Sequence, residues 1–314
     1  MREAADKPDY MRLLDAEALT RIGRLELIAR GLVEGFVAGR HRSPYRGFSV
    51  EFAEHREYVA GDDTRDIDWR VYAKSDRYYV KRYIEETNLR SVILLDASGS
   101  MKYAGQEAAR RGGARLSKFA YGQYLAASLA YLMVNQQDAV GLVTFDAGVR
   151  RYIPPRSRAT HLRVILQEIN ATEPGKETRL APVFHDIADR VHRRGLVVVI
   201  SDLFDDPGGI LRALHHFRYR KHEVIVFHVM AEEELTFPFD GWSEFRDLED
   251  AQHRVPLDPH ALRAAYLDEV GRFIAEIEKG CGQMSIDYVP LSTKHDFDVA
   301  LATYLARRRS LKGL

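Results

Sequence analysis

The sequence predicts an α/β protein built on a doubly wound, mostly parallel sheet, with a small amino-terminal subdomain of one helix and β-strands. Two short runs, at residues 92–95 and 196–200, contain only aliphatic residues, as in strands that are buried on both faces. From residue 90 onward, strand-like segments alternate with helical segments of ten or more residues, which favours parallel strands covered by helices on both faces. We therefore expect a subdomain over residues 1–89 and an α/β domain over residues 90–314.

The amino-terminal segment predicts one helix and two strands. Apolar residues recur at helical spacing between residues 15 and 37, which indicates an amphipathic helix. Segments 48–58 and 77–86 have the mixed or alternating pattern of strands with a partly exposed face. Between them, segment 61–70 is dense in charge. It is either a structural turn held by Arg–Asp pairs or a surface that contacts a partner.

The α/β segment predicts its elements in alternation. The expected strands cover residues 92–95, 140–145, 150–153, 196–200, 223–229 and 284–289. The expected helices cover residues 114–135, 159–169, 180–192, a segment before residue 223, 259–279 and 295–308. Segment 150–153 is expected as a hairpin return that ends before Pro154, and the sequence leaves open whether the acidic, aromatic connection 231–254 is ordered.

The composition is that of a soluble globular protein and excludes several functional classes. Lys plus Arg and Asp plus Glu both number 46, so no global basic field would attract nucleic acid. No apolar run approaches the roughly 20 residues that span a bilayer, and the first ten residues lack the apolar core of a signal peptide. The single cysteine, Cys281, fits a reducing compartment and is expected as a small semi-buried apolar residue. We expect a cytoplasmic location.

Polar oxygen atoms follow the first buried strand. Asp96, Ser98 and Ser100 offer one carboxylate and two hydroxyls in alternation, at the strand end where open α/β sheets place their ligands. Such hard oxygen donors suit Mg²⁺ or Mn²⁺ better than zinc. The same residues could instead cap a helix, since Ser and Asp serve that role well.

Two later loops complete this oxygen set. Thr178 lies in a loop that opens a helix, and Asp202 follows the second buried strand. We expect Ser98, Ser100 and Thr178 to supply hydroxyl ligands, while Asp96 and Asp202 supply negative charge directly or through bound water. One coordination position would then stay open for an incoming carboxylate.

Two motifs carry a family resemblance. The run at 96–100, Asp-Ala-Ser-Gly-Ser, resembles the first motif of the metal-ion-dependent adhesion site of von Willebrand factor A domains. In that family a second loop gives a threonine and a third gives an aspartate, matching Thr178 and Asp202. The run at 57–69 resembles the signature of the bacterial "domain of unknown function 58" proteins, which carry such an A domain and are associated with MoxR-type AAA+ ATPases. The resemblance covers about residues 39–229, and it departs at Leu203, where many A domains have glycine.

Zinc binding and catalysis find little support in the sequence. The histidines lack zinc-ligand spacing, and His228 falls within a strand, where a core histidine with satisfied hydrogen bonds is commoner. No histidine or lysine stands in motif position beside Asp96, and neither a nucleophile elbow nor a phosphate-binding loop occurs. Basic residues at 110, 111 and 115 form either a solvated loop or a rim that guides an acidic partner.

Together these observations predict a binding module and not an enzyme. We expect metal-dependent docking of an acidic residue of a partner protein, and the resemblance implies a MoxR-type AAA+ ATPase in a chaperone-like or maturation assembly. One alternative is a Mg²⁺-dependent hydrolase or phosphotransferase that uses Asp96 and Asp202. The other is a scaffold whose metal site is vestigial.

Overall fold

The computed structural model describes residues 25–27, 29–30, 33, 55–57, 72, 77–81, 89–105, 116–175, 179–241, 243–246, 254–294, 300–304 and 306. By their contacts, residues 1–36 and 88–314 form one compact unit and residues 37–87 form a second. The division of the chain into 1–89 and 90–314 stays a prediction. None of the helices in the described part of the chain is long and apolar enough to cross a membrane.

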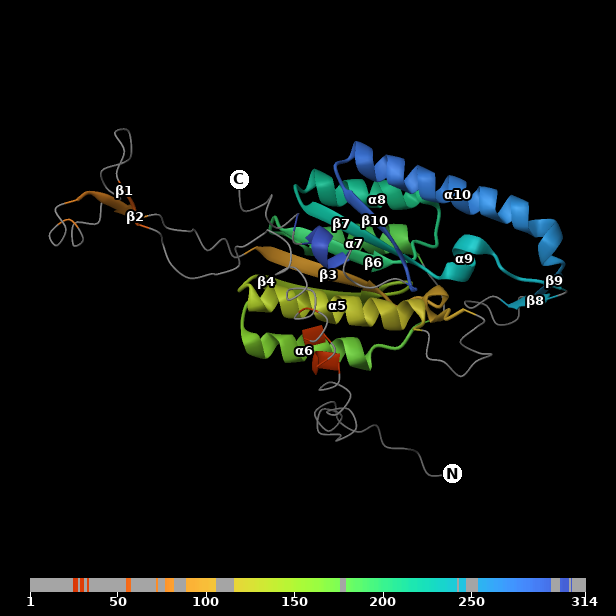
Figure 1. Cartoon of the computed structure of the whole chain (residues 1–314), viewed down its shortest axis with the longest axis horizontal. Helices are drawn as coiled ribbons and strands as arrows, with labels where there is room; N and C mark the ends of the chain where they lie inside the picture. Colours follow the sequence, from red (N-terminus) through yellow and green to blue (C-terminus); the bar gives the residue numbers. More distant parts are fainter. Residues whose placement is uncertain are drawn as a thin grey trace, which may run out of the picture. The chain divides into compact units, whose positions relative to one another are not determined.

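A six-stranded sheet forms the centre of the larger unit (Figure 1). Its strands are β3 (Arg90–Asp96), β4 (Ala139–Phe145), β5 (Val149–Arg156), β6 (Leu196–Ser201), β7 (Glu223–Met230) and β10 (Asp287–Ser292). They lie in the order β10-β7-β6-β3-β4-β5, and every neighbouring pair is parallel except β4 with β5. This arrangement confirms the predicted α/β class with a mostly parallel sheet.

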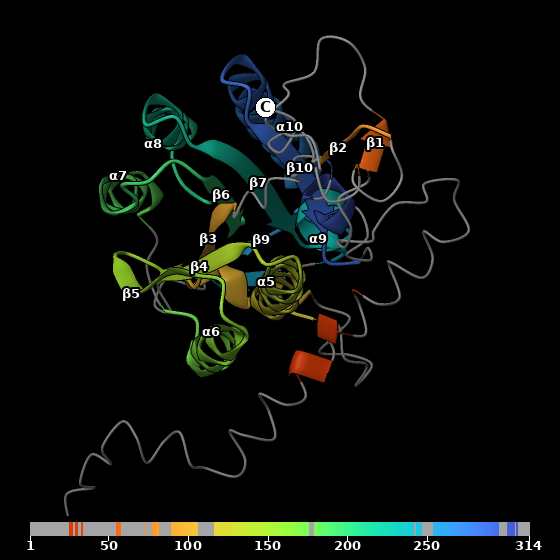
Figure 2. The same cartoon turned by 90° about the vertical axis from the view of Figure 1, so that its left-hand side faces the viewer.

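Helices cover both faces of this sheet (Figure 2). The helices α5 (Lys118–Asn135) and α6 (Ala159–Ala171) pack on one face, and α7 (Leu180–Arg190), α8 (Pro207–Tyr219) and α10 (Pro259–Gln283) pack on the other. The pleat of β3 sends alternate side chains to opposite faces, so both faces of the central strand are buried. The second face also buries Cys281, which confirms its predicted apolar role.

The edge strand β5 runs further than the sequence suggests. The hairpin return was expected to end before Pro154, yet the strand continues through Pro154 and Pro155 to Arg156. Proline cannot donate a backbone hydrogen bond, and an edge strand has one side on which no ladder bond is needed. The strand can therefore extend through both prolines.

The connection after β7 is ordered where the structure describes it. It contains the short helix α9 (Glu232–Thr236) and the strand β8 (Ser243–Arg246), which pairs antiparallel with β9 (Arg254–Leu257). Phe237 and Phe239 are buried, and the ring of Tyr266 on α10 lies 4.5 Å from that of Phe237. Arg263 donates hydrogen bonds to the carbonyls of both phenylalanines. Aromatic packing against α10 thus fixes this segment.

Among the element boundaries that differ from the predicted ones, two starts have a clear local cause. Helix α5 begins at Lys118 and not at 114, because the Ser117 hydroxyl caps it by accepting a hydrogen bond from Ala120 N at 3.0 Å. Strand β10 begins at Asp287 and not at 284, since Ser285 has a φ of 54° and turns the chain after α10. In both cases a single residue, the cap Ser117 or the turn residue Ser285, sets where the element begins.

The predicted amino-terminal elements are described in part. Leu25, Ala29 and Val33 are buried at a spacing of four, as on one face of a helix, and the described residues around them are helical. In the second unit, β1 (His55–Glu57) pairs antiparallel with β2 (Tyr79–Lys81), within the two predicted strands. The charged segment 61–70 lies outside the described residues.

Candidate metal centre

The candidate site lies at the carboxyl ends of the two central strands. β3 and β6 are parallel neighbours, with Leu95 paired to Ile200, so Asp96 and Asp202 emerge at the same edge. From β3 the chain proceeds to β4 on one side and later to β6 on the other. The edge between β3 and β6 is therefore the position where the winding direction reverses, and ligand sites of open α/β sheets form there.

The first motif forms a compact turn of oxygen atoms. Ser98 N donates a hydrogen bond to Asp96 Oδ1 at 2.8 Å, and the hydroxyl oxygens of Ser98 and Ser100 lie 3.1 Å apart. A 3₁₀ helix, η2 (Ser100–Lys102), follows with Gly99 at its amino-terminal cap and no side-chain capping bond. The structure thus does not use these residues as the helix cap that the sequence also allowed.

The hydroxyl spacing fits an octahedral metal. Mg²⁺ binds oxygen at about 2.0–2.1 Å, which places adjacent ligand atoms of an octahedron roughly 3 Å apart. The Ser98 and Ser100 oxygens have that separation. These two residues would hold the ion, and the carboxylates of Asp96 and Asp202 would offset its charge. When bound, the metal would supply a Lewis-acid position for a carboxylate oxygen.

Asp96 is fully buried and held by two serines. Its Oδ2 accepts a hydrogen bond from Ser201 Oγ at 2.5 Å, and its Oδ1 is held by Ser98 N. Burial, followed by the negative charge of Asp202, raises the pKa of Asp96 to about 7, against the opposing effect of these hydrogen bonds. A nearby cation would stabilise the ionised form of such a carboxylate and lower its pKa.

Asp202 is paired with a buried lysine. Lys118 Nζ lies 2.8 Å from Asp202 Oδ2 and 2.5 Å from Glu234 Oε1, and the Lys118 side chain is 3% exposed. Burial opposes ionisation of Asp202, but the Lys118 charge and hydrogen bonds from Lys118, Ser100 and Phe204 hold its pKa below the ordinary value. Burial likewise opposes the charge on Lys118, while the two carboxylates raise its pKa. The three groups form a charged triad in which Lys118 and Asp202 are buried and Glu234 is partly exposed.

The loop after Asp202 keeps a left-handed turn without glycine. Leu203 has a φ of 54°, is fully buried, and donates its N–H to Ser201 Oγ at 2.9 Å. A non-glycine residue in this region costs roughly 1–2 kcal/mol, and the buried side chain offsets that cost. The departure from the A-domain pattern at this position therefore leaves the turn itself in place.

His228 is a core histidine, as predicted. It is buried, its Nε2 lies 2.9 Å from the backbone oxygen of Asp202, and its Nδ1 lies 2.6 Å from the hydroxyl of Tyr288. Burial lowers the pKa of His228 to about 4. Within the described residues, no three His, Cys, Asp or Glu side chains gather as a metal site, so the candidate centre depends on hydroxyl donors.

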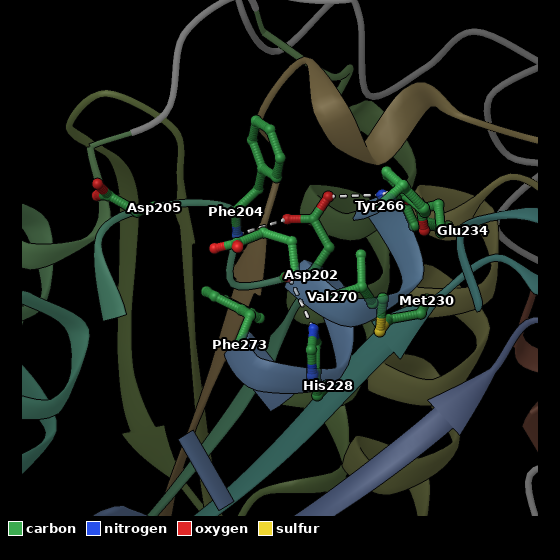
Figure 3. Close-up of a pocket in the computed structure, with 11 residues that line it drawn as sticks. Asp202, Phe204, Asp205, His228, Met230, Glu234, Tyr266, Val270 and Phe273 are labelled. Carbon is green, nitrogen blue, oxygen red and sulfur yellow. Dashed lines mark hydrogen bonds and ion pairs between the residues drawn. The ribbon is translucent and has the colours of Figure 1, made fainter. Parts of the chain in front are cut away.

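A cavity of about 320 Å³ opens beside Asp202 (Figure 3). Figure 3 shows Phe204, Val270 and Phe273 around Asp202, with His228 at the far end and Asp205 to one side. The start of α5, the loop after β6, strand β7 and helices α9 and α10 supply its walls, namely Lys118, Asp202, Phe204, Asp205, His228, Met230, Glu234, Tyr266, Glu269, Val270 and Phe273. The cavity thus adjoins the candidate metal centre directly.

Some predicted residues come together and others lie outside the described part. Asp96, Ser98, Ser100 and Asp202 meet at one edge, as expected. Thr178 lies outside the described residues, as do the basic residues at 110, 111 and 115. The coordination of a metal by these residues stays a prediction.

Sequence reasoning missed the residues that support the carboxylates. Ser201 immediately precedes Asp202 at the end of the second aliphatic run, and a hydroxyl at that position is a signal that could have been used. Lys118 and Glu234 lie 116 positions apart and gave no usable signal, because a lysine at a helix start and a glutamate in an acidic segment are common on surfaces.

Comparison with known proteins places the chain in a family. The model of the family described as "Protein of unknown function DUF58" matches residues 54–273. The chain belongs to this DUF58 family. An uncharacterised protein, Rv1480, of Mycobacterium tuberculosis H37Rv is 27% identical over 307 residues, covering 94% of this chain and 91% of that protein.

The solved structures to which the chain is similar include proteins from two Bacteroides species. BatB from Bacteroides thetaiotaomicron is 19% identical with a TM-score of 0.47, covering 71% of this chain and 99% of the other. An aerotolerance-related membrane protein from Bacteroides fragilis is 19% identical with a TM-score of 0.46, covering 70% and 99%. The proximal thread matrix protein 1 of the mussel byssus, with a zinc-occupied MIDAS motif, is 14% identical with a TM-score of 0.36, covering 45% and 38%.

Proposed function

We propose that this DUF58 protein is a metal-ion-dependent interaction module that binds an acidic side chain of a partner protein through Mg²⁺ or Mn²⁺. The observation that carries the proposal is the pair of serine hydroxyls, 3.1 Å apart, placed between two buried carboxylates at the winding reversal of the sheet. Hydroxyl and carboxylate oxygens are the donors that Mg²⁺ and Mn²⁺ prefer.

The donor set favours binding over turnover. Catalysis needs a nucleophile or general base beside a partner group that activates it. Ser98 and Ser100 contact each other, Ser201 donates to Asp96, and Lys118 is held by two carboxylates. The buried imidazole of His228 contacts the backbone oxygen of Asp202. These groups are positioned to fix charge and not to move protons to a substrate.

The proposed partner is a MoxR-type AAA+ ATPase that presents an Asp or Glu to the metal, in a chaperone-like or maturation assembly. The support for this partner is the family resemblance of the 57–69 run, and a cytoplasmic location is proposed with it. An acidic partner residue would complete the metal shell, so binding should depend on both the metal and that carboxylate.

The first experiment is calorimetric titration of Mg²⁺ and Mn²⁺ into the metal-stripped protein. Ser98→Ala, Ser100→Ala and Asp96→Ala should abolish saturable binding. Asp186→Ala is the matched control, because Asp186 is an exposed carboxylate on α7 that pairs with Arg190. Unchanged metal binding in the three site variants would refute the proposed centre.

The second experiment tests the partner. A purified MoxR-type ATPase from the same genome is titrated with the protein in Mg²⁺ and in chelator, using wild type, Asp96→Ala and Asp186→Ala. We expect binding only with metal and only when Asp96 is present. Binding that survives both chelation and Asp96→Ala would show that the ATPase contacts another surface.

A further inference from the structure

The cavity beside Asp202 has mostly apolar walls. Phe204, Met230, Tyr266, Val270 and Phe273 contribute side chains to it, and its volume of about 320 Å³ is at the lower end of the range for binding pockets. It is large enough for a single bulky side chain. Of the described residues assigned to the metal centre, Asp202 lines this cavity, whereas Asp96, Ser98 and Ser100 do not.

Four polar side chains of the wall, Lys118, Asp202, His228 and Glu234, already have partners inside the protein. Glu234 Oε1 accepts from Lys118 Nζ at 2.5 Å, and Glu234 Oε2 accepts from Ala231 N at 2.8 Å. Both ring nitrogens of His228 have partners, and Asp202 Oδ2 accepts from Lys118. An apolar group that enters the cavity therefore leaves these hydrogen bonds in place.

The mouth of the cavity has the features of a contact surface. Phe204, two residues after Asp202, is 68% exposed, and large exposed aromatics beside a site are typical of protein-interaction surfaces. Among the described residues, the wall contributes four carboxylates, Asp202, Asp205, Glu234 and Glu269, against one lysine, Lys118, while Arg272 pairs with Glu269 from outside the wall. This excess of negative charge favours neutral or basic residues next to the group that enters.

We propose that this cavity receives a bulky apolar side chain, aromatic or long aliphatic, from the same partner segment whose carboxylate docks at the metal. This inference rests on the proposed function and adds the partner's sequence requirement to it. The recognised segment carries an acidic residue, an apolar anchor at a fixed spacing from it, and neutral or basic neighbours.

The test is selection of a random peptide library, displayed on phage, on the intact protein in Mg²⁺. Enriched peptides should carry Asp or Glu together with Phe, Trp, Leu or Met at a constant spacing. A labelled enriched peptide is then titrated by fluorescence anisotropy. Full burial of such a side chain corresponds to roughly ten- to hundred-fold in affinity, so Val270→Trp, which fills the cavity, should weaken binding by that factor.

A second variant and two controls keep the test independent of folding. Phe204→Ala removes an exposed aromatic and should also weaken binding of the enriched peptide. The matched controls are Val164→Trp on α6 and Tyr219→Ala on α8, since Val164 and Tyr219 are 46% and 79% exposed and do not line the cavity. Both controls should bind the peptide as wild type does.

The outcomes separate this inference from the proposed function. Acid enrichment without an apolar preference, or unchanged peptide binding in Val270→Trp and Phe204→Ala, overturns the inference and leaves metal-dependent docking in place. Enrichment of Lys or Arg at the anchor position overturns it in favour of a cation-binding cavity. Apolar enrichment with no acid and no dependence on Mg²⁺ refutes the proposed function, and a library that yields no enriched peptide overturns the inference.

Discussion

Replacing Lys118 with methionine should lower the free energy of unfolding by about 3–5 kcal/mol, the cost of leaving buried charge uncompensated. The Lys118 ammonium is 2.8 Å from Asp202 and 2.5 Å from Glu234. At an effective dielectric constant of about 20, each contact corresponds to on the order of 6 kcal/mol of Coulomb attraction. Desolvation of the buried ammonium offsets much of this attraction.

The choice of methionine isolates the electrostatic part. Methionine has a similar length and fills the same space, so the cavity contribution stays small. The Asp202 side chain is 2% exposed and would keep a charge without its main partner, whereas the Glu234 side chain is 25% exposed and can be solvated in part. Most of the loss should therefore come from Asp202.

The assay is guanidinium unfolding monitored by circular dichroism, extended to a double-mutant cycle with Asp202→Asn. Because the second substitution removes the stranded charge, the double variant should lose several kcal/mol less than the sum of the single variants. The control is Lys294→Met, since Lys294 pairs with Glu232 at 3.8 Å and is 56% exposed, and such a pair contributes at most about 1 kcal/mol. A Lys118→Met loss no larger than the control loss, or additive effects in the cycle, would refute this account of the triad.

Three further predictions concern regions away from the metal centre. His161 and His222 are buried with lowered pKa values, chiefly because burial penalises the cation, so at these two residues the unfolded state binds more protons below pH 6.5. Their contribution to stability should therefore fall as the pH falls from about 6.5, and the unfolding free energy of wild type minus that of His222→Gln should be smaller at pH 5.5 than at pH 7.5. Gly195→Ala should lose more than about 1 kcal/mol in the same assay, because its Cβ would lie against a backbone carbonyl oxygen, while Gly148→Ala, with open space around it, should change little. Cys281, whose pKa burial raises to about 12, should react with a thiol reagent only as fast as the protein opens.

Each of these predictions has a contrary result. An unfolding free-energy difference between wild type and His222→Gln that is constant or grows as the pH falls from 7.5 to 5.5 would contradict the assignment of a neutral buried His222. Equal losses for the two glycine variants would show that the close approach at Gly195 relaxes without cost. Rapid labelling of Cys281 under native conditions, at a rate that added denaturant does not increase, would contradict its burial in the core.

Local sequence patterns were enough to predict most of the strands and helices of the α/β unit. The aliphatic runs at 92–95 and 196–200 have no polar face, so they can be stable only as central strands, and they became β3 and β6. The helices between them forced parallel connections. The boundaries of α5 and β10 could not be predicted as well, because a cap at Ser117 and a left-handed turn at Ser285 decided them.

The sequence alone determined which residues stand at the ends of the central strands, because strand period and topology place Asp96, Ser98, Ser100 and Asp202 at one edge whatever the details of packing. Only the tertiary structure showed that Lys118 and Glu234 meet Asp202, and that a largely apolar cavity lies beside it. The contacts of a charged side chain depend on which distant segments fold against it, and no local pattern of residues encodes a pairing across more than 80 positions.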